Sequence, residues 1–178
     1  MTDITNLREA FLDEIRDVYH AEKQLLKALP KLATAASDGE LRGALENHLA
    51  ETENQVSRLE QVFELVGAKP GTKTCAGMAG IIEEGSDVLH EAGGPVLDAL
   101  IIASAQRAEH YEIAAYGTVA AWAESLGYTD AAELLRETLD EEKTADETLT
   151  GLAEAGINAA AGGSTPAAGK ARAAGSQL

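Results

Sequence analysis

The chain has few of the features that mark secreted, membrane or β-sheet proteins. Cys75 is its single cysteine, so no disulfide can form within the chain, which fits a reducing compartment. Aromatic residues make up only 4% and there are 4 prolines, while Ala, Leu and Glu dominate, which favours closely packed helices. No segment approaches the roughly 20 apolar residues of a membrane span, and no basic stretch followed by an apolar run opens the sequence. We therefore expect a cytoplasmic protein that does not contact membranes.

Basic residues are also scarce. The chain has 14 Lys and Arg residues against 30 Asp and Glu residues, giving a formal net charge of −16 at pH 7. Such a surface repels phosphate backbones, so we expect no nucleic-acid binding and disfavour a DNA-coating cage. An acidic surface attracts cations, although a solvated acidic surface needs no partner. The 45% of hydrophobic residues is enough for one domain with a core.

Apolar residues recur at helical spacing in four long segments, beginning near Thr5, Gly39, Pro95 and Asp130. A shorter helix is predicted over residues 76–91, and its length suits a crossover that makes the second and third long helices parallel. The predicted fold is all-α, a four-helix bundle with this short additional helix between helices two and three. The bundle is expected to take residues 1–160, and the Ala/Gly-rich residues 161–178 are predicted to form a flexible tail.

Each long helix carries an acidic residue where its apolar stripe predicts a buried hydrophobic side chain: Glu22, Glu51, Glu112 and Glu142. A bare buried charge costs several kcal/mol, so each must be paired, protonated or bound to a cation. The first two and the last two are separated by nearly equal numbers of residues, and each pair lies on a predicted antiparallel hairpin. Two such hairpins would set four carboxylates at one height around one axis.

The helical phase leaves two choices open. In the second helix the inward position falls on Glu51 or Thr52, and in the third helix either Glu109 or Glu112 faces the axis. Polar residues close to these positions are further candidate ligands: Glu109, His48, Gln55 and Asp146.

Four inward carboxylates would repel one another, and two divalent or trivalent metal ions would relieve that repulsion. Helix bundles hold di-iron and di-manganese sites with a Glu from each of two helices and Glu-x-x-His from each of the other two. Here Asn54 and Ala145 stand where those histidines would be, while Gln55 and Asp146 lie one residue further on. A carboxylate-rich set with one imidazole favours hard metals, so the expected cofactor is iron or manganese, two ions per chain.

A structural explanation of the same residues is also open. The four carboxylates could be neutralised within the core by arginines on neighbouring helices: Arg58, Arg107 or Arg136. His48 would then be an ordinary core histidine. Three tyrosines are expected to pack with their hydroxyls on carboxylates: Tyr19, Tyr111 and Tyr116.

Four stretches resemble the YciE/YciF family of ferritin-like bacterial stress proteins: Tyr19–Pro30, His48–Glu60, Glu109–Gly117 and Glu137–Lys143. The resemblance covers about residues 5–157 and keeps all four motifs in order. It implies a ferritin-like, rubrerythrin-like bundle, a homodimer, a dinuclear metal site and a role in stress. Carried over by motif, it implies Glu22, Glu51, Glu112 and Glu142 as ligands, with Glu109, His48, Gln55 and Asp146 around them.

Two hypotheses of different classes follow. In the first, the chain is a ferritin-like stress-response protein whose carboxylate-bridged dinuclear iron or manganese site handles iron, peroxide or oxygen. In the second, it is a metal-free helical homodimer that acts as a structural or interaction module in stress. The residues leave open the reaction and whether the chain is an enzyme.

Overall fold

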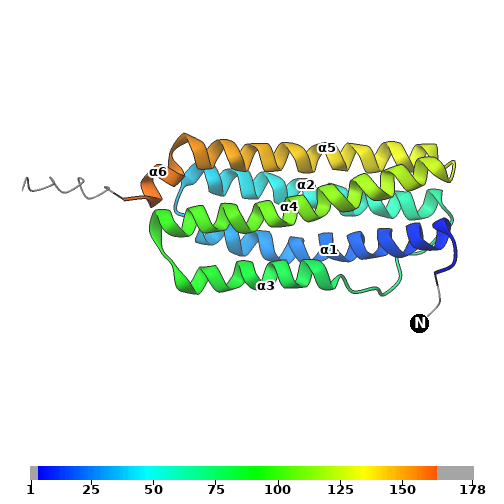
Figure 1. Cartoon of the computed structure of the whole chain (residues 1–178), viewed down its shortest axis with the longest axis horizontal. Helices are drawn as coiled ribbons and strands as arrows, with labels where there is room; N and C mark the ends of the chain where they lie inside the picture. Colours follow the sequence, from blue (N-terminus) through cyan, green and yellow to red (C-terminus); the bar gives the residue numbers. More distant parts are fainter. Residues whose placement is uncertain (1–3, 164–178) are drawn as a thin grey trace, which may run out of the picture.

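The computed structural model describes residues 4–163, and within that range all regular secondary structure is helical. Four long helices lie side by side: α1 (Leu7–Ala35), α2 (Gly39–Leu65), α4 (Gly94–Ser125) and α5 (Thr129–Leu152) (Figure 1). The shorter α3 (Ala76–Glu91) lies along α1 and α4, and a π-helical turn, η1 (Ala153–Ile157), leads into α6 (Asn158–Ala161). The predicted all-α bundle is confirmed. Of the tail predicted at residues 161–178, the part from residue 164 on lies outside the described residues.

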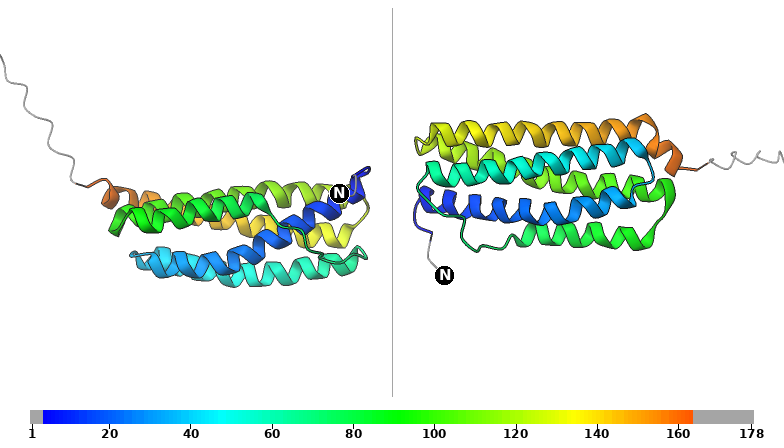
Figure 2. Two further views of the ribbon diagram at one scale, coloured as in Figure 1. Left: turned by 90° about the horizontal axis from the view of Figure 1, so that it is seen from below. Right: turned by 180° about the vertical axis from the view of Figure 1, so that it is seen from behind.

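The crossover sets the direction of the later helices. Helix α2 ends at Leu65, where Gly67 adopts a left-handed backbone (φ 65°) that is costly for other residues. The following loop and α3 bring the chain back along the bundle, so α2 and α4 run in the same direction (Figures 1 and 2). No helix within residues 4–163 is long and apolar enough to cross a membrane.

The turn between α1 and α2 is fixed by two aspartates. Asp38 is the N-cap of α2, and its side chain accepts hydrogen bonds from the amides of Glu40 (2.9 Å) and Leu41 (3.0 Å). Asp98, buried on α4, accepts from the amides of Ser37 (2.7 Å) and Asp38 (3.1 Å). These bonds tie the first hairpin to α4 and so fix the height at which its side chains meet those of the second hairpin.

The apolar core consists of two clusters with a polar layer between them. The first cluster, near the α1–α2 turn, includes Leu25, Leu45, Ala108 and Leu149. The second cluster lies towards the other end and includes Val18, Leu59, Ala115 and Leu135. Apart from Asp98 and Ser104 of α4, the buried polar residues fall between these two sets: Glu22, His48, Thr52, Gln55, Glu109, Glu112, Thr138 and Glu142. We call these eight residues the polar layer.

Candidate metal centre

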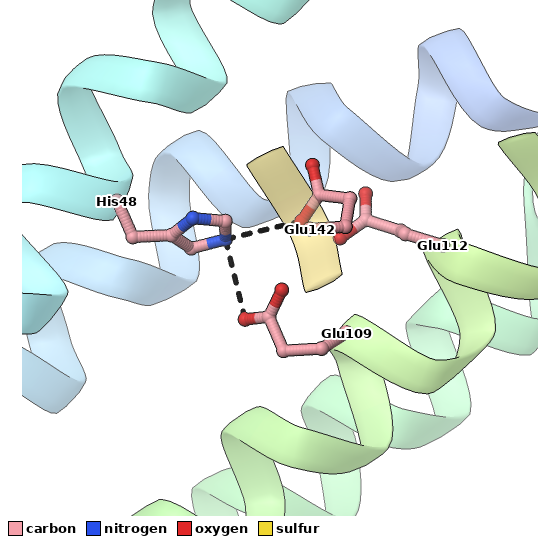
Figure 3. A group of neighbouring side chains, drawn as sticks. All are labelled: His48, Glu109, Glu112 and Glu142. Carbon is pink, nitrogen blue, oxygen red and sulfur yellow. Dashed lines mark ion pairs between the residues drawn. The ribbon is translucent and has the colours of Figure 1, made fainter. Parts of the chain in front are cut away.

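Four side chains of the polar layer converge at the centre of the bundle. His48 reaches inward from α2, Glu109 and Glu112 from α4, and Glu142 from α5 (Figure 3). One potential ligand atom from each lies within 4.8 Å of the others. His48 Nε2 is 3.3 Å from Glu109 Oε1 and 3.8 Å from Glu142 Oε2. Three carboxylates and one imidazole therefore surround a single point.

Glu22 adds a carboxylate from α1 to the same layer. Its side chain is fully buried, and one of its oxygens, Oε1, accepts a hydrogen bond from the hydroxyl of Tyr116 on α4. Its other oxygen has no hydrogen-bond partner. Burial raises its pKa, and the charge of Glu142 raises it further. All four long helices thus contribute to the layer.

The buried oxygens of this layer are largely unpartnered within the described residues. Neither carboxylate oxygen of Glu112 or Glu142 has a hydrogen-bond partner, and Glu109 Oε2 also lacks one. His48 Nε2 is close enough to Glu109 to count as an ion pair, but its geometry does not make a hydrogen bond. A buried polar atom left unsatisfied costs about 1 to 3 kcal/mol, and more if it is charged. The arrangement is unfavourable unless protons or cations bind there.

The arginines considered for neutralisation form no ion pair with the buried acids of the polar layer within residues 4–163. Arg58 binds Glu137 and Glu141, and Arg136 binds Glu124 at the surface. Arg107 is exposed. Among residues 4–163, His48 is the only basic side chain paired with a carboxylate of the layer. The structural explanation based on arginine therefore does not account for these buried acids.

The same environment raises the pKa values of the buried acids. Burial, with the charge of Glu142, raises the pKa of Glu22 to about 8. Burial, with the charge of Glu22, raises the pKa of Glu109 to about 7. Burial also raises the pKa of Glu112 and of Glu142 well above the usual value, although the charge of His48 partly offsets it for Glu142. The layer therefore holds protons at pH values where exposed glutamates have lost them.

His48 responds in the opposite sense to a typical buried histidine. Burial alone lowers its pKa, but contact with Glu51 and the charges of Glu142 and Glu22 outweigh that effect, so the pKa is raised. When protonated, the imidazole is the only cationic side chain of residues 4–163 that pairs with the buried carboxylates around it. It therefore acts as a partial counter-ion to them.

The second helix places Thr52, not Glu51, at the fully inward position. Glu51 lies at the edge of the site with 46% of its side chain exposed, and its Oε2 is 3.5 Å from His48 Nδ1. The stripe of α2 runs through His48, Thr52 and Gln55, one helical turn apart. A shift of one residue in helical phase separates the two choices left open by the sequence. In the third long helix, both Glu109 and Glu112 face the centre.

Gln55 and Asp146 lie beside the centre and are engaged by other groups. Gln55 is buried, and its Nε2 donates to Glu141 Oε2 (3.1 Å), while its Oε1 has no partner. Asp146 accepts from Gln106 Nε2 (3.0 Å) and lies 3.3 Å from His110 Nε2. Of these two residues, only Gln55 turns an unpartnered buried oxygen towards the interior.

Two cavities reach the centre from opposite sides of α4. One, of about 130 Å³, opens between α2 and α5 and is lined by His48, Glu51, Glu109 and the hydroxyls of Thr144 and Thr148. The other, of about 40 Å³, lies beneath α3 and is mostly apolar, with Leu25, Leu29, Ile82 and Ala105 among its lining residues. Glu109 borders both cavities, so among the buried carboxylates of the polar layer it is the one that both cavities reach.

Tyrosine roles were only partly visible in the sequence. The three predicted hydroxyl–carboxylate contacts are present: Tyr19 with Glu60, Tyr111 with Asp17, and Tyr116 with Glu22. The sequence did not indicate which of them reaches the candidate centre. The signal was its spacing, because Tyr116 lies four residues after Glu112 and therefore shares its helix face. The threonines of the cavity were missed altogether, since small polar residues also occur on ordinary surfaces.

Comparisons with known proteins agree with the fold. Residues 6–162 match the family described as Domain of unknown function (DUF892). The chain is 46% identical to Protein YciF of Escherichia coli (strain K12) over 158 residues, which is 88% of this chain and 95% of that protein. The crystal structure of the E. coli stress protein YciF matches with a TM-score of 0.84 at 45% identity, covering 87% of this chain and 99% of that one.

A second solved relative, YcfI from Rhodopseudomonas palustris, is described as a candidate structural protein. It matches with a TM-score of 0.81 at 44% identity, over 84% of this chain and 96% of that one. A protein from Xanthomonas campestris pv. campestris is 22% identical and matches with a TM-score of 0.69, which shows a shared fold. The resemblance to the YciE/YciF family suggested by the four sequence motifs is confirmed.

Proposed function

The chain belongs to the family described as Domain of unknown function (DUF892), and on that premise we propose that it is a stress-response protein with a dinuclear iron or manganese centre. The observation that carries the proposal is the polar layer, where α1, α4 and α5 bury carboxylates beside His48 of α2, and these carboxylates have no arginine or lysine partner among the described residues. The solved relative YciF of E. coli is called a stress protein, which supports the proposed role in stress.

The donor atoms fit hard metal ions. Three carboxylates and one imidazole surround a single point: Glu109, Glu112, Glu142 and His48. Glu22 adds a carboxylate from α1. Oxygen-rich sets with an imidazole suit iron and manganese better than soft metals. When bound, such a metal supplies a redox-active Lewis acid that can bind peroxide or oxygen. Binding would also replace the protons that the raised pKa values retain on Glu22 and Glu109.

Residues around the layer have roles of their own. Tyr116 holds one oxygen of Glu22, which fixes the orientation of that carboxylate. Glu51, half exposed beside the cavity between α2 and α5, places negative charge at the entrance and would attract cations. Glu51 also contacts His48 Nδ1, leaving Nε2 facing Glu109 and Glu142. His48 therefore connects Glu51 at the mouth of the cavity with Glu109 and Glu142 in the interior.

Metal analysis tests the proposal directly. Protein expressed in iron-rich and in manganese-rich medium should carry about two ions per chain, by analogy with bundles of this type. The double variant Glu112→Gln/Glu142→Gln should lose most of that metal. The matched control Glu133→Gln/Glu147→Gln alters two exposed glutamates of α5 and should retain it. If wild-type protein from both media contains no iron or manganese, and soaked crystals show no density in the layer, the metal proposal is wrong.

The second candidate is a metal-free helical homodimer that acts as a structural module. The description of the relative YcfI as a candidate structural protein favours it. It predicts that Glu112→Gln/Glu142→Gln changes stability while metal content stays at the background level of wild type. Light scattering in solution tests the homodimer, which both candidates share. The cytoplasmic location remains a prediction from the sequence.

A further inference from the structure

A basic pocket lies on the outside of the bundle, away from the polar layer. It has a volume of about 250 Å³ and lies between α1 and the loop that precedes α3. Four basic residues line it, Arg16, Lys23, Lys27 and Lys73, and none of its lining residues is acidic. The whole chain has 14 basic and 30 acidic residues, so this concentration runs against the composition. We call it the basic pocket.

Helical spacing produces one wall of the pocket. Arg16, His20, Lys23 and Lys27 follow one another at intervals of four, three and four residues on α1, and such residues share one face of a helix. Like charges four residues apart, as in Lys23 and Lys27, disfavour the helix slightly. Neither lysine forms an ion pair within residues 4–163. Both ammonium groups are therefore available to an external anion.

The opposite wall is a loop fixed firmly against α1. Arg16 Nε donates to the carbonyl of Lys69 (3.2 Å), and Lys73 pairs with Asp13 and with Asp17. Gly71 has a left-handed backbone (φ 76°), and an added Cβ would lie 3.2 Å from Arg16 Nε. Glycine adopts the left-handed backbone without strain and has no Cβ to displace Arg16. The pocket is thus formed before any ligand arrives, which lowers the entropy cost of binding.

Further groups can orient a bound anion. His20 Nδ1 faces the amide of Cys75 (3.2 Å), which leaves its Nε2–H as a donor in the neutral ring. Thr72 and Thr74 lie in the loop wall. Lys23 Nζ lies 5.0 Å from the centre of the Tyr19 ring, whose hydroxyl is held by Glu60 (2.8 Å). Ammonium, imidazole and hydroxyl donors together are typical of phosphate sites.

We propose that the basic pocket binds a small anion with two or more phosphate groups, such as an inorganic polyphosphate or a nucleoside triphosphate. Several phosphates are needed to span basic side chains that belong to two walls. Lys23 and Lys27 supply the uncompensated charge, and Arg16 and Lys73 are held in place by the loop and by aspartates. A nucleic acid would extend beyond the pocket onto a surface that is acidic overall, which disfavours it.

Calorimetry on the full chain as purified tests this assignment, with sodium tripolyphosphate and ATP as the probes in about 0.15 M salt. Both should bind saturably. The variant Lys23→Gln/Lys27→Gln should weaken binding about tenfold or more, because each lysine makes a charge-assisted contact. The control Arg107→Gln/Lys143→Gln makes the same change of net charge at exposed sites on α4 and α5 and should leave binding unchanged. Circular dichroism checks that both variants are folded.

Each outcome decides the matter. Equal affinity for the two probes supports a site that reads phosphates alone, and tighter binding of ATP supports one that also reads the nucleoside. Absence of saturable binding by either probe overturns the proposal, as does an equal loss in the control variant. Binding of a short DNA duplex as tightly as tripolyphosphate would overturn the assignment to a small molecule. Tripolyphosphate and ATP also chelate metal ions, but wild type and both variants have the same polar layer, so the differences in binding between them do not depend on whether that layer holds metal.

Discussion

Two neighbouring residues of α5, Glu141 and Glu142, belong to regions that treat negative charge in opposite ways. Glu141 belongs to a cluster around Arg58, whose guanidinium donates to Thr138 (2.7 Å), to Glu137 (2.8 Å) and to both oxygens of Glu141 (2.8 and 2.9 Å). Glu142 points into the polar layer, where neither of its oxygens has a hydrogen-bond partner. Arginine therefore neutralises Glu141 on this helix, but no arginine neutralises Glu142 in the polar layer.

The pKa values show the same contrast. Burial alone would raise the pKa of Glu141, but hydrogen bonds from Arg58 and Gln55 outweigh it and lower the value. Burial raises the pKa of Glu142 well above the usual range. Glu141 thus stays ionised at neutral pH beside its arginine partner, whereas Glu142 lies in a group of acids that is stabilised by taking up protons or metal ions. This difference supports reading the layer as a binding site instead of a stabilising element.

Loss of metal-linked stability should be the largest effect. With Mn²⁺ at about a thousand times its dissociation constant, wild-type protein should gain about 4 kcal/mol of unfolding free energy. The melting temperature should rise by on the order of 10 °C, because a chain of this size shifts a few degrees per kcal/mol. Glu112→Gln/Glu142→Gln should show almost no rise in differential scanning calorimetry. Equal rises in both proteins would place the metal outside the layer.

The pH dependence of metal-free protein should come next. Glu22 and Glu109 have folded pKa values of about 8 and about 7, above their unfolded values. The folded state then holds more protons, so stability should fall as pH rises from about 5 to about 8, by roughly several kcal/mol. Glu141, with a lowered pKa, loses its contribution only at more acidic pH.

Urea unfolding with a chelator present, at several pH values across this window, measures the slope. The variant Glu22→Gln/Glu109→Gln should have a flatter profile, because neither side chain can titrate. A wild-type profile that rises over this range would mean that the layer is already ionised and compensated.

Removal of Arg58 should have a smaller effect. Arg58→Leu leaves Glu137 and Glu141 without their donor, and we expect a loss of about 2 kcal/mol, typical of charge-assisted hydrogen bonds. Metal content should not change. Arg136→Leu removes an exposed pair with Glu124 and should cost less than about 1 kcal/mol. Chemical denaturation of both variants compares them, and an equally small loss would show that the Arg58 cluster is no stronger than a surface pair.

Tyr116→Phe should have the smallest effect of the four. It removes the hydroxyl that donates to Glu22, at a cost of about 1 kcal/mol. That hydrogen bond lowers the pKa of Glu22, so its removal should raise the pKa further and move the pH profile to higher values. Tyr19→Phe, whose hydroxyl meets Glu60 near the surface, is the control. A profile identical to wild type would show that Tyr116 contributes packing alone.

Much of the fold could be predicted because the helical period is strong in this sequence. The short helix was expected at residues 76–91 and is found at Ala76–Glu91. Glu22, Glu112 and Glu142 were expected in apolar stripes and are all buried. The period also allowed Glu109 to face inward with Glu112, since residues three apart share a face.

Other features depend on contacts between helices or on small angles. A rotation of one residue about α2 decides between Glu51 and Thr52, and no pattern in the sequence fixes that angle. Arg58 was considered as a partner for the buried acids, but it reaches across to α5 and binds Glu137 and Glu141. The basic pocket was hidden by the total charge, because it forms only when the loop at residues 69–74 folds against α1.

The division of the apolar core has a mechanical consequence. The two apolar clusters, separated by the polar layer, resemble the cores of two short bundles more than the core of one long bundle. Without a bound ligand, we expect the polar layer to be the least stable level of the bundle, so that each half can unfold locally without the other. A cation bound in the polar layer would link the four long helices at their midpoints. Metal binding would then make the two halves of the bundle move as one rigid unit.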